Sequence, residues 1–472
     1  MTTAVVVGSG PNGLAAALVL ADAGVKVTVV EAADTLGGGT RSAELTLPGL
    51  VHDVCSAIHP LAIATRFSQA FDLAEHGLSW VEPEVQYSHP LDGGRGAAAY
   101  RSVEETAQDL GGRDGRTWSR VFGSLTDRFD TIADEFLQPV LHVPQHPLHL
   151  GRFGLYAGQP ASLLARRWHD DEARGLFAGI AAHAFRPFGS LVSSAIGVAL
   201  GTAAHRYGWG AAVGGSGAIA QAMIAAGGQR GVRYETGRTV TDLDELGPVD
   251  LVLLDTGPGA ATDIVGDRLP RHVARAYRAY RHGPGAFKVD FAVEGGVPWA
   301  HEPSRRAGTV HVGGTFEEVA AAEADVARGR MPERPFVLAA QQYVADPSRS
   351  VDDVHPFYTY AHVPAGYTGD ATEAIVAQVE RFAPGFRDRI RATAVSSTTE
   401  LSQKNANYVG GDIVSGANDP LQLVFRPRVT LRPYDTGADG IYLCSAATPP
   451  GAGAHGMSGY WAAQAALRAL ER

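Results

Sequence analysis

The feature that most constrains the fold is a glycine-rich loop near the start of the chain. Residues 8–13 read Gly-Ser-Gly-Pro-Asn-Gly, after an apolar run at 4–7 that is typical of a buried strand. An alanine- and leucine-rich stretch at 11–23 predicts a helix, and a second apolar run at 25–30 predicts another strand. Such β-α-β units build parallel, doubly wound sheets that are covered on both faces. The sequence therefore predicts a Rossmann-like α/β domain.

The glycines of this loop suit the diphosphate of a dinucleotide. Gly8 can make the tight turn, Gly10 lets the backbone approach the phosphates, and Gly13 permits close packing of helix on strand. Backbone N–H groups at the positive end of the helix dipole would hold the phosphates. Glu31 lies eighteen residues after Gly13, at the end of the second strand, where its carboxylate can accept hydrogen bonds from both hydroxyls of an adenosine ribose.

Two further glycine loops indicate which dinucleotide is bound. Residues 36–42, Leu-Gly-Gly-Gly-Thr-Arg-Ser, supply backbone N–H groups and a cation just beyond Glu31, and a nicotinamide-binding domain needs neither. Residues 448–459 form a third loop before a C-terminal helix, whose N-terminus would face the N1/C2=O edge of an isoalloxazine ring. An ordinary loop and a simply capped helix are the alternative interpretations. Together the loops predict FAD.

The loops and their spacing resemble the FAD-dependent carotenoid (phytoene) desaturases and desaturase-like relatives, within the flavin amine-oxidase superfamily. The resemblance covers nearly the whole chain and includes Gly-Gly-Ser-Gly-Ala-Ile at 214–219, Gly-Pro-Gly-Ala-Phe-Lys-Val-Asp at 283–290, Asn-Tyr-Val-Gly-Gly-Asp at 407–412 and Tyr-Leu-Cys-Ser-Ala at 442–446. Within the family the chain most resembles the branch that includes pyridine nucleotide-disulfide oxidoreductase domain-containing protein 2. The resemblance implies an extended FAD and an apolar tunnel that ends at the flavin.

The predicted cofactor-binding residues come mainly from the three loops. Ser445 stands where many flavoproteins have an aspartate that holds the ribityl chain, and the desaturases also have small residues there. The complete predicted set is Gly8, Gly10, Pro11, Asn12, Gly13, Glu31, Ala32, Gly38, Gly39, Thr40, Arg41, Val240, Ser445, Gly456, Met457 and Ser458.

Two interleaved domains are predicted. An FAD-binding domain would comprise residues 1–70, 206–284 and 425–472, with further strands at 232–234, 239–243, 251–254 and 441–444 and a final helix at 456–470. An α+β substrate-binding domain would comprise residues 71–205 and 285–424, with strands at 287–293 and 336–343. Its first part is predicted to be mostly helical, with core positions at helical spacing. These positions are Trp118, Val121, Phe122, Leu125 and Phe129.

Two histidines are candidate catalytic residues. His455 lies inside the third glycine loop, where an imidazole could move a proton or polarise the flavin. His59 follows the second loop closely enough to approach the flavin. A histidine with a purely structural role is the alternative at both positions. Lys288 resembles the water-holding lysine of amine oxidases in residue type alone, and its alternating strand favours a solvated or paired side chain.

Composition excludes several other classes of protein. With 40 Lys+Arg against 50 Asp+Glu, the net charge of −10 offers no basic stripe for nucleic acid. Cys55 and Cys444 lie far apart and form no C-x-x-C pair, which favours a reducing, cytoplasmic environment. No apolar run reaches the roughly 20 residues of a membrane-spanning helix, although peripheral membrane contact stays compatible with the sequence. Prolines separate His142, His146 and His149, so no metal site is predicted.

The predicted function is FAD-dependent dehydrogenation or desaturation of an apolar, isoprenoid- or lipid-like small molecule. A substrate C–H bond would deliver hydride to flavin N5 while a neighbouring proton leaves. Amine oxidation is one alternative, with Tyr408, Tyr460 and Trp461 as candidates for an aromatic cage. A non-catalytic isoprenoid- or flavin-binding protein is another, since this fold also serves as an isoprenoid-binding escort of small GTPases.

Overall fold

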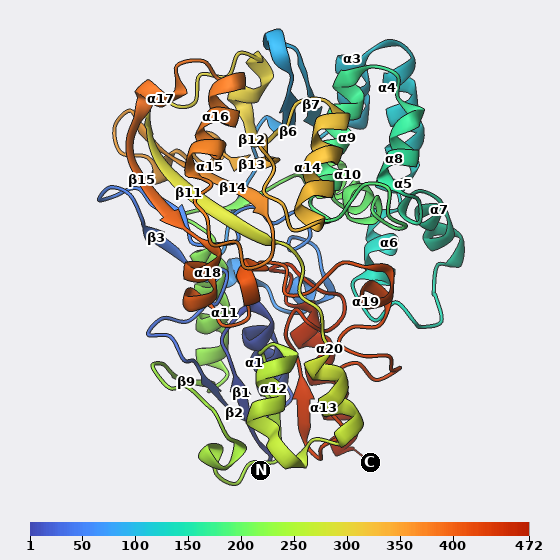
Figure 1. Cartoon of the computed structure of the whole chain (residues 1–472). Coiled ribbons are helices and arrows are strands. Elements are labelled where there is room, and N and C mark those ends of the chain that lie inside the picture. Colours follow the sequence, from blue (N-terminus) through green and yellow to red (C-terminus); the bar gives the residue numbers. More distant parts are fainter. Residues whose placement is uncertain (472) are drawn as a thin grey trace.

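A computed structural model describes residues 1–471 and contains a five-stranded and a seven-stranded sheet (Figure 1). The five-stranded sheet has the order β16-β10-β1-β2-β9, and all its neighbouring strands run parallel. Its strands are β1 (Thr3–Val7), β2 (Lys26–Val30), β9 (Arg233–Glu235), β10 (Leu251–Leu254) and β16 (Ile441–Leu443). The chain therefore returns to this sheet twice after leaving it.

Helices cover both faces of the five-stranded sheet, because alternate residues of its strands point to opposite sides. Ala4 and Val6 belong to a core with α1 (Pro11–Asp22), α11 (Gly217–Gln229) and α20 (Met457–Leu470). Val5 and Val7 belong to a separate core with α12 (Pro258–Val265) and α13 (Arg271–Arg278). This arrangement confirms the predicted doubly wound, Rossmann-like fold.

One predicted strand of this sheet is wrong. Residues 239–243 do not join the sheet, and a short 3-10 helix, η5 (Leu243–Leu246), forms at its end. The Asp242 side chain accepts a hydrogen bond from the N–H of Asp244, and Glu245 accepts one from the N–H of Asp242. Such local side-chain bonds compete with strand pairing for the backbone donors.

The seven-stranded sheet has the order β15-β11-β14-β13-β12-β6-β7 and is antiparallel except where β12 pairs with β6. The predicted strand at 336–343 is shorter than expected, because the chain turns into α15 (Gln342–Ala345). The strands are β6 (Val85–Pro90), β7 (Gly96–Tyr100), β11 (Gly285–Glu294), β12 (Ala307–Val312), β13 (Val337–Ala340), β14 (Val354–Val363) and β15 (Ile390–Ser396). On one face lie α16 (Thr372–Phe382) and α17 (Phe386–Arg389), whose apolar side chains share a core with the strands.

The other face of this sheet meets the helices of residues 103–207. They are α3 (Val103–Leu110), α4 (Gly112–Trp118), α5 (Ser124–Thr126), α6 (Phe129–Phe136), α7 (Pro147–Ala157), α8 (Ala161–Leu164), α9 (Asp171–Ala182) and α10 (Ala195–Tyr207). All five aromatic and aliphatic positions predicted as core between 118 and 129 are at most 1% exposed. The helical prediction for this segment is therefore confirmed. Within residues 1–471 no helix has the length and apolar character to cross a membrane.

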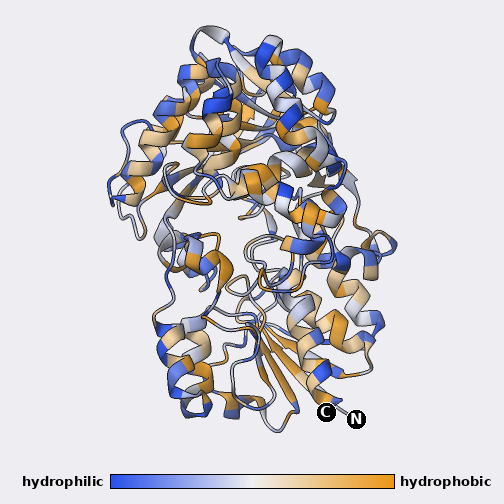
Figure 2. Ribbon diagram, turned by 90° about the vertical axis from the view of Figure 1, so that its right-hand side faces the viewer, coloured by the Kyte–Doolittle hydropathy of each residue, from blue (hydrophilic) through white to orange (hydrophobic). Residues whose placement is uncertain are grey.

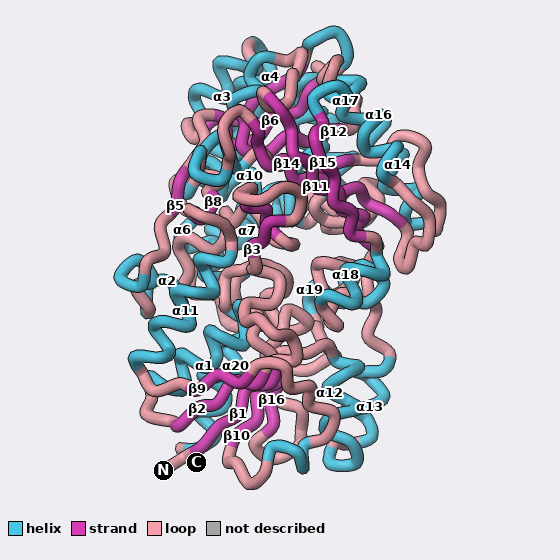
Figure 3. Tube along the Cα trace, turned by 90° about the vertical axis from the view of Figure 1, so that its left-hand side faces the viewer, coloured by secondary structure: helices cyan, strands magenta, loops and turns pink. Residues whose placement is uncertain are grey.

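The two sheets are separated by a layer of loops (Figure 3). Apolar residues concentrate along the strands and on the inner faces of the helices (Figure 2). All strands of the five-stranded sheet lie within residues 1–70, 206–284 and 425–472, and all strands of the seven-stranded sheet lie within 71–205 and 285–424. The exact domain boundaries stay a prediction. The loop layer between the sheets contains the candidate site.

Candidate functional site

A cavity of about 730 Å³ lies in this loop layer. All three glycine loops reach it, and it also contacts β12, β13 and β14 of the seven-stranded sheet. Side chains from α6, α7 and α10 complete the wall with an apolar surface. The apolar members include Phe136, Leu137, Val140, Leu150, Phe153, Ile196 and Leu200.

Part of the predicted cofactor set lines this cavity. The lining residues are Gly10, Pro11, Asn12, Gly39, Thr40 and Ser445. The remaining members lie outside its wall, and they are Gly8, Gly13, Glu31, Ala32, Gly38, Arg41, Val240, Gly456, Met457 and Ser458. Val240 is buried in one core with Val30, at the strand that ends beside Glu31. The predicted roles in cofactor binding stay predictions.

The first two glycine loops fit against each other so closely that side chains are excluded. Gly8 has a φ of +99°, a conformation that favours glycine. A Cβ on Gly38 would lie 2.7 Å from the Cα of Gly10. A Cβ on Gly39 would lie 2.2 Å from the hydroxyl of Tyr408. The loops therefore form a cradle of glycine backbone without side chains, the kind of surface that a phosphate group needs.

Polar groups beside the first glycine loop also suit a dinucleotide. The Glu31 carboxylate is fixed by hydrogen bonds from the N–H and hydroxyl of Ser9, at 2.9 and 2.5 Å, and from the N–H of Ala33 at 2.9 Å. Asn12 lines the cavity and is only 3% exposed, yet its Oδ1 has no partner within the described chain. A buried polar atom without a partner indicates that a ligand or water completes it.

Asp255 is a buried acid beneath the dinucleotide loop that sequence analysis missed. It follows β10 directly, and its Oδ2 accepts a hydrogen bond from the N–H of Gly13 at 3.0 Å. A Cβ on Gly10 would lie 2.6 Å from the same oxygen. Burial, with a smaller contribution from the charge of Glu31, raises the pKa of Asp255 to about 8. The sequence feature that could have identified Asp255 is its position directly after the apolar run at 251–254.

The side chain of Arg41 is bound to protein oxygens at the edge of the cradle. Its Nε donates to the carbonyl of Gly38 at 2.7 Å and its Nη2 donates to the carbonyl of Lys404 at 2.9 Å. These bonds hold the second glycine loop against the segment that follows α18 (Thr398–Lys404).

His455 lines the cavity and also caps the last helix. Its Nδ1 accepts a hydrogen bond from the N–H of Met457 at 3.1 Å, so the neutral ring carries its proton on Nε2. Burial lowers the pKa of His455 to about 4. Gly456, with a φ of +69°, supplies the left-handed turn that begins α20. The N–H of Met457, at the N-terminus of α20, is thus bonded to His455 and not free for a ligand. In this respect the helix end is a simple cap, the alternative interpretation of the third loop.

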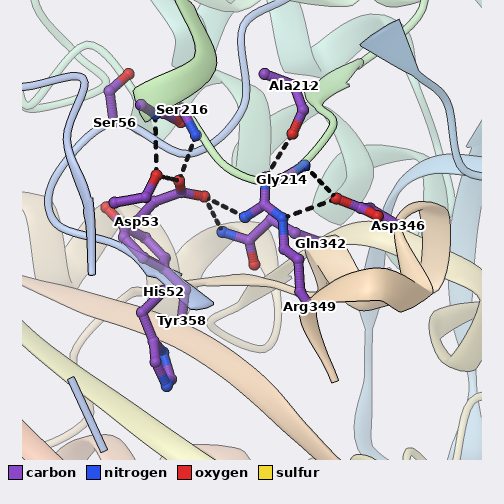
Figure 4. Close-up of polar contacts among 12 residues, drawn as sticks. His52, Asp53, Ser56, Ala212, Gly214, Ser216, Gln342, Asp346, Arg349 and Tyr358 are labelled. Carbon is purple, nitrogen blue, oxygen red and sulfur yellow. Dashed lines mark hydrogen bonds and ion pairs between the residues drawn. The ribbon is translucent and has the colours of Figure 1, made fainter. Parts of the chain in front are cut away.

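His59 also lines the cavity. It contacts a buried polar network that includes Ser216, Asp53 and Arg349, and these three residues are shown in Figure 4. The Nε2 of His59 lies 2.8 Å from the hydroxyl of Ser216, whose N–H donates to Asp53 at 2.6 Å. Asp53 pairs with Arg349 at 2.6 Å, and Arg349 also contacts Asp346 at 3.3 Å. Burial lowers the pKa of His59 to about 4. Sequence analysis missed this network because its members are far apart along the chain.

Lys288 does not line the cavity. Its side chain is 2% exposed, forms an ion pair with Asp290, and lies with Nζ 4.5 Å from the ring centroid of Tyr358. The side chain is therefore paired, one of the two states predicted from the sequence. Tyr358 stands between it and the cavity, with its hydroxyl bonded to the carbonyl of Cys55 at 2.6 Å.

The predicted aromatic cage does not form. Tyr408 lines the cavity, but Tyr460 and Trp461 do not. The Trp461 Nε1 instead donates to the carbonyl of Leu137 at 2.9 Å, which turns the ring toward α6. Two tyrosines that were not predicted take part in the wall, and they are Tyr358 and Tyr360 of β14.

The three separated histidines and the two cysteines have structural surroundings. His142 contacts Glu135 at 2.5 Å, and the ring of His146 stacks on His149 at 5.7 Å between centroids. Across residues 1–471 there is no group of three or more potential metal ligands. Both cysteines are buried and free.

Comparisons with known proteins agree with this architecture. Residues 6–74 match the NAD(P)-binding Rossmann-like domain. Over 95% of its length the chain is 26% identical to a phytoene dehydrogenase of Streptomyces griseus, 91% of which is covered. An oxidoreductase structure from Methanosarcina mazei matches all of both chains with a TM-score of 0.65 and 14% identity. Putrescine oxidase bound to putrescine matches with a TM-score of 0.61 and 18% identity, covering 100% of this chain and 99% of that one. These findings confirm the predicted fold class and the resemblance drawn from the motifs.

Proposed function

We propose that this chain, an oxidoreductase of the phytoene dehydrogenase and flavin amine-oxidase type, binds FAD and dehydrogenates an apolar, isoprenoid- or lipid-like small molecule. The observation that carries the proposal is the continuity of one cavity. Its wall includes Gly10 and Asn12 of the dinucleotide loop, Ser445 and His455 of the C-terminal region, and the apolar side chains of α6, α7 and α10. A cofactor and an apolar substrate would therefore share one compartment.

The chain's own groups fit an extended dinucleotide. Glu31 would accept hydrogen bonds from the ribose hydroxyls, and the backbone of residues 8–13 with the N-terminus of α1 would hold the diphosphate. The unpartnered Asn12 Oδ1 is an acceptor available to such a ligand. Ser445 and the loop at 448–459 would contact the ring system. When bound, FAD would supply the hydride acceptor for the oxidation.

The side chains around the cavity provide a largely apolar and weakly charged environment. The low pKa values of His59 and His455, each about 4, mean that both imidazoles are neutral at pH 7. We propose that they act as neutral hydrogen-bonding groups, His455 from its Nε2–H, that orient the substrate and relay the departing proton. The apolar wall from α6, α7 and α10 would exclude water from the reacting C–H bond.

Anaerobic reduction of the FAD-loaded protein tests this function. Mixing with polyenes or other apolar lipids should bleach the flavin absorbance. Ala199→Trp on α10, where the alanine lines the cavity and is 8% exposed, should keep FAD but slow bleaching by long substrates. Ala321→Trp on the exposed side of α14 (Phe316–Ala327) is the matched control and should behave as wild type. An absence of bleaching with every substrate tried would count against the proposal.

Amine oxidation is the second candidate, because three tyrosines, Tyr358, Tyr360 and Tyr408, line the cavity. Release of hydrogen peroxide on addition of amines in air would favour it. A protein that is colourless and takes up no FAD would instead favour a non-catalytic isoprenoid-binding role.

Exposed apolar side chains near the cavity support peripheral membrane contact as the route of substrate entry. Val143, Leu148 and Leu155, in and before α7, are 89%, 85% and 70% exposed, and Val140 of the same region both lines the cavity and is 45% exposed. Apolar groups this exposed are typical of interaction surfaces. Flotation of the protein with lipid vesicles should weaken in the double variant Leu148→Ser, Leu155→Ser. Equal flotation of variant and wild type would refute this route.

A further inference from the structure

Arg426 is the only arginine or lysine in the cavity wall, among residues 1–471. It follows α19 (Pro420–Val424) and is 2% exposed. Within the part of the chain that the structure describes, the one acidic side chain in the wall is Asp255, whose pKa of about 8 keeps it mostly protonated at pH 7. His59 and His455 are neutral at that pH. Arg426 therefore brings a permanent positive charge to a wall that is otherwise nearly uncharged.

The protein contacts of Arg426 leave this charge uncompensated. Its Nε donates to the carbonyl of Gln422 at 3.3 Å, and its Nη1 donates to the carbonyl of Ala446 at 3.2 Å. Its Nη2 donates to the side-chain oxygen of Asn418 at 3.1 Å. These bonds use three of the five N–H donors of a guanidinium, and none of the acceptors is a carboxylate. A buried charge without a counter-ion is costly, so an anionic ligand would stabilise it.

The other buried basic side chains are neutralised by the protein itself. Lys288 pairs with Asp290, and Arg349 pairs with both Asp53 and Asp346. Neither of these cations lines the cavity. The chain thus supplies carboxylates to Lys288 and Arg349, which lie outside the cavity wall, and supplies none to Arg426, which is part of the wall.

Nearby acids on the adjoining segments are engaged elsewhere. Asp412 accepts hydrogen bonds from three backbone N–H groups, at 2.7, 2.8 and 3.0 Å, and lies 3.4 Å from His282, which is also in the wall. Asp419 pairs with Arg281 at 2.6 Å and caps α19. The positive charge that faces the cavity is therefore left for a ligand.

We propose that Arg426 binds a carboxylate of the substrate, so that the substrate is an amphipathic carboxylic acid with an apolar body. The proposal rests on the proposed function, because it places the acid in the same cavity as the flavin. A planar guanidinium matches the two oxygens of a carboxylate. The apolar body would contact Phe136, Leu150 and Phe153. The same charge disfavours a cationic amine, because like charges repel in a desolvated site.

The experiment compares ligands of equal chain length in the FAD-loaded protein. Decanoate, decanol and decylamine are titrated, and binding is followed by the flavin difference spectrum and by the shift in melting temperature. Wild type should bind decanoate roughly 10- to 100-fold more tightly than decanol, and decylamine least tightly. Arg426→Met should abolish the preference for the acid and leave decanol affinity within about twofold. Arg426→Lys should retain part of the preference for the acid, because lysine keeps the positive charge but lacks the planar guanidinium.

Arg278→Met is the matched control, since it removes a positive charge from an exposed side chain of α13 that lies outside the cavity wall. It should keep the acid preference. A wild type without that preference, or an Arg426→Met variant that retains it, overturns the proposal. If Arg426→Met does not fold, the relative affinities for decanoate, decanol and decylamine in wild type and in Arg426→Lys test the proposal. Failure of the wild type to take up FAD would refute the proposed function. It would not decide the Arg426 proposal, because the shift in melting temperature reports binding of the acid without flavin.

Discussion

Arg349 and Asp53 form a buried ion pair with 2.6 Å between Nη1 and Oδ2, although 296 positions separate them in the sequence. Arg349 lies in the short 3-10 helix η8 (Pro347–Arg349), and Asp53 ends β4 (Val51–Asp53). Through the N–H of Ser216, Asp53 also supports the residue that holds His59 at the cavity. The pair thus connects a segment beside the seven-stranded sheet to the candidate site (Figure 4).

Arg349→Met should destabilise the fold strongly, because it leaves the fully buried Asp53 carboxylate without its cation. The free energy of unfolding should fall by about 3–5 kcal/mol. Urea unfolding, followed by circular dichroism, measures this change. Arg238→Met is the control, because Arg238 and Glu235 form a solvent-exposed pair whose loss should alter stability by less than about 1 kcal/mol. Equal effects of the two substitutions would contradict a structural role for the buried pair.

Asp255→Asn should change how stability depends on pH. Because burial raises the pKa of Asp255 from 3.8 to about 8, the folded protein binds a proton that the unfolded chain releases. The Asp255 contribution to the free energy of unfolding therefore decreases as pH rises from about 4 to about 8, by at most roughly 1.4 kcal/mol per pH unit. Asparagine can still accept the Gly13 N–H bond.

Urea unfolding of FAD-free wild type and Asp255→Asn at pH 5, 6.5 and 8 measures this effect, with pH values chosen to span the titration. The difference in stability should grow in favour of the variant as pH rises. Parallel pH curves for the two proteins would mean that Asp255 keeps an ordinary pKa.

Gly10→Ala and Glu31→Gln should each weaken FAD binding. A Cβ on Gly10 would lie 2.6 Å from Asp255 Oδ2, so either the loop or the buried Asp255 side chain must move, which disturbs the proposed diphosphate site. Glutamine at 31 replaces a charged acceptor with a weaker one, which should lower affinity roughly tenfold or more. Titration of each FAD-free variant with FAD measures its affinity for the cofactor. Gly228→Ala, where an added Cβ meets nothing within 4 Å, should bind FAD as wild type does.

His455→Ala and His455→Asn separate a cap from a catalytic group. Alanine removes the acceptor for the Met457 N–H and should lower stability by about 1 kcal/mol. Asparagine offers a cap acceptor, so it should recover part of that stability but not the function of an imidazole. Thermal unfolding and anaerobic flavin reduction are measured together. Restored reduction in the asparagine variant would show that His455 acts only as the cap.

The sequence alone predicted the structure correctly where the interactions that fix it join neighbouring residues or belong to a motif. The glycine turn at 8–13 between strand and helix, the place of Glu31 directly after β2, the helical spacing of Trp118 to Phe129 and the C-terminal strand and helix agree with the prediction. Prediction was wrong at 239–243, because Asp242 and Glu245 bond the local backbone more favourably than a neighbouring strand does. Tyr460 and Trp461, candidates for an aromatic cage, do not line the cavity, and Trp461 donates to the carbonyl of Leu137 instead.

By itself, then, the sequence determined a Rossmann-like domain with glycine loops suited to a dinucleotide, because a glycine turn, a strand and a helix dipole are properties of neighbouring residues. Only the tertiary structure decided which charges matter in the cavity. Arg349 and Arg426 are alike in the sequence, but folding gives one of them two carboxylates and gives the other only neutral oxygens. Burial likewise raises the pKa of Asp255 and lowers that of His59, since desolvation depends on residues brought together from the whole chain.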